Sequence, residues 1–191
     1  MLGGKDVLDQ EYVTGEWDCL FSIDEVPRFS IISGYCRCFK FGGTLLEVGC
    51  GAGILQTRLD ERQYSRFDGI DISSEAINRA QQKNCSNVMY ICQDASSYIT
   101  SKLFDVIIFN ECLEYFDDPA ALVKRYEAFT NEGALFIVSM FKGITTARTQ
   151  HIWRELDARY TTLAHTTVST KPDYTWKIKV YELKGQNTAK I

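Results

Sequence analysis

The chain lacks the features that mark membrane proteins and nucleic-acid binders. No stretch of its 191 residues approaches the length of an apolar membrane span, and residues 1–6 contain no long apolar run. Lysines and arginines are scattered and the net charge is −4, so no basic surface for DNA or RNA is indicated. We therefore expect a soluble, cytoplasmic protein whose partners include neither nucleic acid nor a membrane.

The chain also lacks a pattern of metal ligands. Its cysteines are odd in number and mostly stand in apolar strand or helix patterns, which favours reduced, buried thiols over a disulfide framework. Cys36 and Cys38 should point to different faces of one helix, and no second Cys/His pair has zinc spacing. We expect no metal site. The cysteines are Cys19, Cys36, Cys38, Cys50, Cys85, Cys92 and Cys112.

What the chain does contain is enough apolar sequence for one core. Hydrophobic residues make up 45% and aromatic residues 13% of its length, so we expect a single domain over residues 1–191. Residues 1–43 read as helical, with a stop at Gly42 and Gly43. Residues 44–140 alternate apolar runs with amphipathic segments, and residues 141–191 end in two β-rich runs.

The alternation predicts βα repeats and a parallel sheet. A helix is expected to begin after the Asp117-Asp118 cap, with Pro119 at its first position, and to end at residues 131–133. The expected strands of the central block are residues 44–48, 67–72, 88–93, 104–110 and 134–140, and the two later β-rich runs are residues 161–170 and 174–183.

The run from Leu45 to Ile54 predicts a nucleotide-type binding turn. A buried strand ends at Glu47 and Val48, and three glycines in five positions leave the following backbone open to a ligand. Ile54, Leu55 and Leu59 follow at helical spacing, so we expect a helix to begin directly after the turn.

Asp71 ends the second expected strand, where a carboxylate can accept hydrogen bonds from both ribose hydroxyls of a bound nucleoside. That geometry suits NAD or S-adenosylmethionine. Ile54 stands where a dinucleotide site needs Gly or Ala, and Glu47 would set a carboxylate beside the pyrophosphate. A cationic ligand therefore matches the turn better, although Asp71 could instead cap the next helix.

Taken together, four motifs resemble a class I S-adenosylmethionine-dependent methyltransferase. They are Glu47-x-Gly49-Cys50-Gly51-x-Gly53, Asp71-Ile72-Ser73, Gln93-Asp94-Ala95 and Phe104-Asp105-Val106-Ile107-Ile108-Phe109-Asn110-Glu111. The resemblance covers about residues 44–140. It implies an α/β fold with a doubly wound, seven-stranded, mostly parallel sheet, an antiparallel terminal hairpin and an N-terminal helical lid.

The resemblance also implies S-adenosylmethionine as cofactor, S-adenosylhomocysteine as product, and roles for individual residues. Asp94 would lie near the adenine amino group, with the Ala95 N–H on a ring nitrogen, unless Asp94 is an ordinary turn residue. The residues implied to bind the cofactor are Glu47, Gly49, Cys50, Gly51, Gly53, Asp71, Ile72, Asp94, Ala95 and Asn110.

The methyl acceptor is expected to be a small molecule, held between the N-terminal segment and residues 141–153. Tyr115 stands where many relatives carry a histidine, so that base is absent, and the candidate catalytic residues are Glu111, Tyr115 and His151. Tyr12 and Trp17 could close over the cofactor or simply pack.

The predicted function is methyl transfer to nitrogen or oxygen of a metabolite. The alternatives are a catalytically silent cofactor-binding partner subunit and an NAD-dependent oxidoreductase. The sequence leaves open the acceptor, the use of a general base and the oligomeric state.

Overall fold

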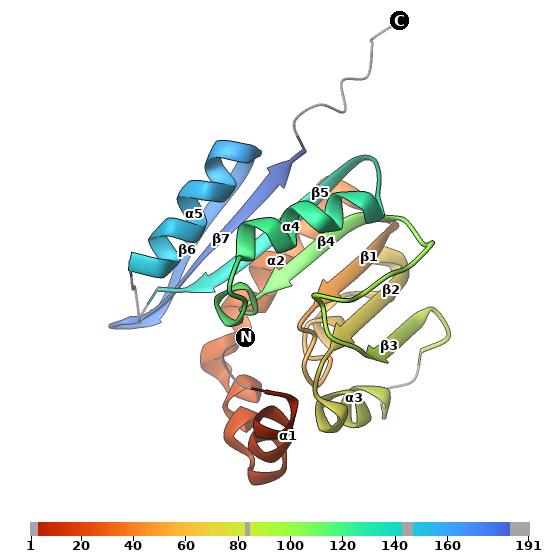
Figure 1. Cartoon of the computed structure of the whole chain (residues 1–191), viewed down its shortest axis with the longest axis vertical. Helices are drawn as coiled ribbons and strands as arrows, with labels where there is room; N and C mark the ends of the chain where they lie inside the picture. The colour runs from red at the N-terminus through yellow and green to blue at the C-terminus, as the bar shows by residue number, and fades with distance from the viewer. Residues whose placement is uncertain (1–3, 83–84, 143–146, 184–191) are drawn as a thin grey trace, which may run out of the picture.

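The computed structural model describes residues 4–82, 85–142 and 147–183, which fold around one mixed sheet (Figure 1). The sheet has seven strands in the order β3-β2-β1-β4-β5-β7-β6. Neighbours from β3 to β5 pair in parallel, whereas β7 pairs antiparallel with both β5 and β6. The strands are β1 (Gly43–Val48), β2 (Tyr64–Asp71), β3 (Val88–Cys92), β4 (Phe104–Asn110), β5 (Thr130–Phe141), β6 (Thr161–Lys171) and β7 (Tyr174–Glu182).

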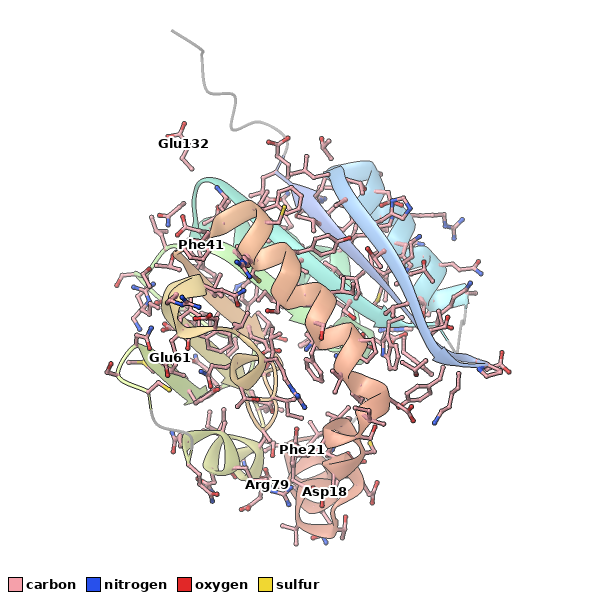
Figure 2. All side chains as sticks on the ribbon, turned by 180° about the vertical axis from the view of Figure 1, so that it is seen from behind. Asp18, Phe21, Phe41, Glu61, Arg79 and Glu132 are labelled. Carbon is pink, nitrogen blue, oxygen red and sulfur yellow. The ribbon has the colours of Figure 1, made fainter. Side chains whose placement is uncertain are left out.

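Helices cover both faces of this sheet, which makes it doubly wound. Helix α2 crosses one face, as Figure 2 shows, and buries Phe29, Ile32 and Cys36 there. Helices α4 and α5 cover the opposite face, while α1 lies at the carboxyl ends of the parallel strands. The α-helices are α1 (Lys5–Thr14), α2 (Val26–Lys40), α3 (Ser74–Gln81), α4 (Pro119–Tyr126) and α5 (Ala147–Arg159).

These findings confirm the predicted fold class, including the terminal hairpin. The start of α4 is also confirmed, because the Asp118 side chain accepts a hydrogen bond from the Ala121 N–H at 2.9 Å and Pro119 opens the helix. The expected end of this helix is wrong. Helix α4 ends at Tyr126, and Gly133, with φ +68°, lies inside β5, where the β4–β5 register shifts and a bulge absorbs the extra residues.

The helix expected directly after the glycine turn is also wrong. Residues 51–55 form turns, followed only by the 3₁₀ helix η3 (Gln56–Arg58). The left-handed backbone at Gly51 and Gly53 is incompatible with an α-helix, and Ile54 and Leu55 are apolar because they enter the core. The β3–β4 connection likewise contains turns instead of the expected helix, since the Asp94 side chain accepts from the Ser96 N–H at 2.7 Å.

The cysteines are all free thiols, as expected. The expectation of burial holds for Cys36, Cys50 and Cys112, whereas Cys19, Cys38 and Cys92 are exposed and Cys85 is half-buried. Within the described residues, no three His, Cys, Asp or Glu side chains gather as a metal site, and no helix has the length and hydropathy to cross a bilayer.

Candidate functional site

The central cavity lies at the carboxyl ends of the parallel strands, where open α/β sheets present their ligands. The residues that line it are Gly49 after β1, Asp71 and Ile72 at the end of β2, and Gln93 and Ala95 after β3. The segment after β4 adds Glu111, Cys112, Tyr115 and Phe116, and the N-terminal segment adds Leu8, Tyr12 and Trp17. The cavity therefore joins all four predicted motifs to the predicted lid.

The glycine turn leaves no room for side chains on its cavity side. Gly49 and Gly51 have φ values of +71° and +52°, in the left-handed region that favours glycine. A Cβ at Gly49 would lie 2.6 Å from Cβ of Cys112, and one at Gly51 would lie 2.7 Å from the Tyr12 hydroxyl. The turn thus brings bare backbone against both the β4 segment and the lid.

Asp71 organises the turn from the neighbouring strand. Its Oδ2 accepts a hydrogen bond from the Gly51 N–H at 2.9 Å, and its Oδ1 accepts one from the Ser73 N–H at 2.8 Å. Burial raises the pKa of this carboxyl, and the backbone hydrogen bonds oppose the rise. The N-cap of α3 is Ser73, whose Oγ accepts from Ala76, so capping does not account for Asp71.

Glu47 lies beneath the turn in a buried polar chain. One carboxylate oxygen accepts from the Asn110 amide at 3.0 Å, whereas Oε2 is buried without a hydrogen-bond partner. Arg28 donates to the Asn110 carbonyl oxygen and pairs with Glu25 at 2.6 Å. Burial raises the pKa of Glu47 to about 8, with Asn110 and Arg28 opposing the rise.

Arg28 is a site residue that the sequence analysis missed. Its side chain is only 1% exposed on the α2 face that also buries Phe29 and Ile32. A charged residue among these apolar positions is a signal that could have been used, because a buried guanidinium requires partners.

The other predicted cofactor residues divide into two groups. Ile72 and Ala95 line the cavity directly. Cys50 and Gly53 belong to the turn but are not among the described residues that line the cavity; a Cβ on Gly53 would lie 2.5 Å from the Tyr90 hydroxyl, and the Cys50 thiol packs against Gly69. Asp94, engaged with Ser96, is not among the described residues that line the cavity.

The predicted catalytic residues are only partly brought together. Glu111 and Tyr115 line the cavity, but His151 is exposed on α5 and lines a separate hollow with Asp117, Asp118 and Glu155. Of the expected acceptor wall, residues 143–146 lie outside the described residues, and residues 141–142 and 147–153 are not among those that line the cavity. Residues 147–153 brace the cavity from outside, since Arg148 donates to the Phe116 carbonyl and Thr149 donates to Glu114 at 2.7 Å.

Glu111 has an unusual environment for a catalytic carboxylate. It adopts φ +57°, and its two oxygens accept hydrogen bonds from the Ser139 hydroxyl at 2.5 Å and the Phe141 N–H at 2.7 Å. Burial raises its pKa. Burial, followed by nearby Glu11 and Glu114, raises the pKa of Tyr115 to about 12, so this phenol is neutral at physiological pH.

A second hollow opens at the mouth of the cavity. It shares Leu8, Trp17 and Tyr115 with the cavity and is bordered by Glu11 and Glu16. An acceptor could therefore approach between the N-terminal segment and the β4 segment.

The strand order, terminal hairpin and glycine turn are those expected of the fold of class I methyltransferases. The chain belongs to the methyltransferase-domain family, whose model matches residues 20–173.

Three curated relatives show the range of this similarity. Malonyl-[acyl-carrier protein] O-methyltransferase 2 of Ilyobacter polytropus is 30% identical over 100 residues, covering 51% of this chain and 39% of that protein. Nodulation protein S of Sinorhizobium fredii is 38% identical over 79 residues, covering 40% and 36%. Ubiquinone biosynthesis O-methyltransferase of Neisseria meningitidis is 29% identical over 117 residues, covering 58% and 48%. Each match spans less than half of the relative.

Solved structures show the same fold at lower identity. The N-methyltransferase NodS from Bradyrhizobium japonicum, in complex with S-adenosyl-L-homocysteine, aligns with a TM-score of 0.80 at 20% identity over 94% of this chain and 98% of that chain. The magnesium protoporphyrin IX methyltransferase ChlM from Synechocystis, with bound SAM, aligns at 0.75 and 15% identity over 96% and 98%.

Proposed function

We propose that this chain transfers a methyl group from S-adenosylmethionine to nitrogen or oxygen of a small molecule. The observation that carries the proposal is the buried Glu47 carboxylate, which has one oxygen without a hydrogen-bond partner beneath a glycine turn that opens into the central cavity. Because its pKa is about 8, Glu47 is largely protonated at neutral pH in the free protein; a cationic ligand would favour its ionised form, whereas a pyrophosphate would disfavour that form.

The charge of the cavity extends this argument. Asp71 and Glu111 line it, and no Lys, Arg or His occurs among the described residues that do so. Nearby Arg28 is already engaged with Glu25 and Asn110. These features favour a sulfonium cofactor over a nicotinamide dinucleotide, which would bring two phosphate charges without a partner.

When bound, S-adenosylmethionine supplies a methyl group on a cationic sulfur. The chain's own residues would bind and orient it: Asp71 at the ribose, and Ala95 with the Asp94 turn at the adenine. The set proposed to hold the cofactor remains Glu47, Gly49, Cys50, Gly51, Gly53, Asp71, Ile72, Asp94, Ala95 and Asn110. Within the predicted lid of residues 1–43, we propose that α1 and Trp17 are the part that covers the cavity.

The acceptor wall favours alignment over strong base catalysis. Tyr115 holds its proton at physiological pH, and the Glu111 oxygens already accept two hydrogen bonds. Orienting the acceptor against the methyl group would supply much of the rate, with the Tyr115 hydroxyl orienting the acceptor and Glu111 receiving a proton only where the nucleophile must lose one.

The relatives' names include both N- and O-methyltransferases, so they leave the acceptor atom open. The hollow at the cavity mouth combines Val7, Leu8 and Trp17 with the carboxylates of Glu11 and Glu16. This combination favours an acceptor with an apolar body that is neutral or cationic.

Two measurements test the proposal. At a hundredfold excess over its dissociation constant, S-adenosylhomocysteine should stabilise the folded protein by about 2.7 kcal/mol and so raise its melting temperature, whereas NAD should not. Transfer of a tritiated methyl group from the cofactor to a metabolite extract should follow. Stabilisation by NAD alone would favour the oxidoreductase, and cofactor binding with no transfer to any acceptor would favour the silent partner subunit.

A further inference from the structure

One carboxylate of α1 binds the beginning of α3 across a long stretch of sequence. Asp9 Oδ1 accepts a hydrogen bond from the Ser73 hydroxyl at 2.6 Å and lies 3.3 Å from the Glu75 nitrogen, which also donates to it. Asp9 Oδ2 accepts from the Ser74 hydroxyl at 3.0 Å. Three donors at the first turn of α3 therefore converge on a single side chain of the N-terminal segment.

The hydrogen bonds to Asp9 outweigh the effect of burial on its pKa. Burial raises the pKa of Asp9, but hydrogen bonds from Lys5, Ser73 and the Glu75 backbone together keep it below its usual range. Lys5 is a half-exposed partner on the same helix, and such a pair contributes little on its own. The Asp9 contacts that join α1 to another element are those with residues 73–75, and Arg79 of α3 makes a further contact with α1 by donating to the Tyr12 carbonyl.

Ser73 connects this carboxylate to the cavity. Its backbone N–H donates to Asp71 at 2.8 Å while its hydroxyl donates to Asp9, and the residue is fully buried. Asp71 in turn holds the Gly51 N–H. The chain Asp9–Ser73–Asp71–Gly51 therefore runs from the N-terminal helix to the ligand-facing backbone.

The same helix carries residues that cover the cavity. Tyr12 lies one turn after Asp9, and its ring stacks on Trp17 with centroids 5.9 Å apart. Leu8, Tyr12 and Trp17 all line the cavity. Arg79 of α3 adds a second attachment by pairing with Asp18 at 2.8 Å, and Figure 2 shows these two side chains together where α3 meets the N-terminal segment.

We propose that Asp9 and Ser73 form a latch that keeps α1 closed over the cofactor cavity, with both acting as positioning residues. The proposal rests on the proposed function, because the cavity is taken to hold S-adenosylmethionine or its product. Breaking the latch would leave the binding residues in place but allow Tyr12 and Trp17 to move away, so bound product would leave faster.

The first experiment needs no cofactor. Trp17 is half-buried, whereas Trp153 and Trp176 are 7% and 2% exposed, so acrylamide quenching of tryptophan fluorescence reports chiefly on the lid. Asp9→Ala should increase quenching in the free protein. Asp6→Ala is the matched control, since it removes an exposed carboxylate from the same helix turn and should leave quenching unchanged.

The second experiment follows release of S-adenosylhomocysteine by stopped-flow chase. Asp9→Ala should raise the dissociation rate about tenfold with no fall in the association rate, and Asp9→Asn should recover part of the loss because its amide oxygen still accepts from Ser73. Equal quenching and release rates for wild type and Asp9→Ala, or equal effects of Asp6→Ala, would overturn the latch. Failure of the wild type to bind this probe would instead overturn the proposed function, while the quenching comparison would still judge the latch.

Discussion

Asn110 at the end of β4 donates its side-chain amide to Glu47 at the end of β1, with 3.0 Å between the two atoms. This bond joins the two central strands beneath the glycine turn and satisfies only one of the Glu47 oxygens. Burial raises the pKa of the Glu47 carboxyl, and this hydrogen bond and Arg28 oppose the rise.

The raised pKa of Glu47 predicts a specific pH dependence of stability. The pKa is about 8 in the folded protein against 4.5 for the ordinary group, so the folded state holds a proton that the unfolded chain releases between these values. Stability of the ligand-free protein should therefore fall as pH rises from about 5 to 8, by on the order of a few kcal/mol. Glu47→Gln should flatten this slope, which denaturant unfolding at several pH values would measure. An unchanged slope would contradict the assignment.

Asp71→Asn should weaken cofactor binding without unfolding the domain. The variant keeps an acceptor for only one of the Gly51 and Ser73 N–H groups and loses the charge-assisted bonds proposed for the ribose. We expect the dissociation constant of S-adenosylhomocysteine in calorimetry to rise roughly 10- to 100-fold, as for loss of about 1.5–3 kcal/mol. Unchanged affinity beside a large fall in melting temperature would mean that Asp71 only shapes the turn.

Gly51→Ala should weaken cofactor binding, although it adds only a methyl group. Alanine would have to adopt the left-handed φ of +52°, and its Cβ would lie 2.7 Å from the Tyr12 hydroxyl. Gly34→Ala is the control, because a Cβ there meets no atom within 4 Å and α2 should gain about 0.5–1 kcal/mol. Comparable cofactor affinity in both variants would argue against a ligand close to Gly51.

Periodicity and turn chemistry predicted most of the strands, the start of α4 and the terminal hairpin, because each depends on local sequence. They failed after the glycine turn, where Ile54 and Leu55 have helical spacing but serve the core from turns. Motif spacing placed Asp71 and Ala95 at the cavity but did not reveal Asp9, and the apolar pattern around Arg28 could have marked that residue as buried without naming its partner. Their partners lie far along the chain, Asn110 for Arg28 and Ser73 for Asp9, and only the folded topology brings them together.

Substitutions of the candidate catalytic residues should differ in their effect on kcat according to whether the residue lines the cavity. Glu111→Gln should lower kcat by roughly 10²–10⁴ if Glu111 receives the acceptor's proton, while cofactor affinity holds. Tyr115→Phe should cost less, because it removes only a neutral hydroxyl. His151→Gln should leave kcat unchanged, because His151 lines a different hollow. Steady-state kinetics with isothermal binding would check each variant. A large loss in His151→Gln alone would restore the acceptor wall expected from the sequence.

The charge at the cavity mouth should decide which acceptors are methylated. Two carboxylates line this hollow. Glu11 accepts a hydrogen bond from the Trp17 indole N–H at 3.1 Å, and Glu16 is exposed. An amine acceptor should therefore have a lower KM than a carboxylate of the same shape, because its cation meets carboxylates and an aromatic face. Glu16→Lys should narrow or reverse the difference at low salt, whereas Glu155→Lys, at the separate hollow, should not. Faster methylation of the carboxylate by the wild type, or equal effects of both lysine variants, would place the acceptor elsewhere.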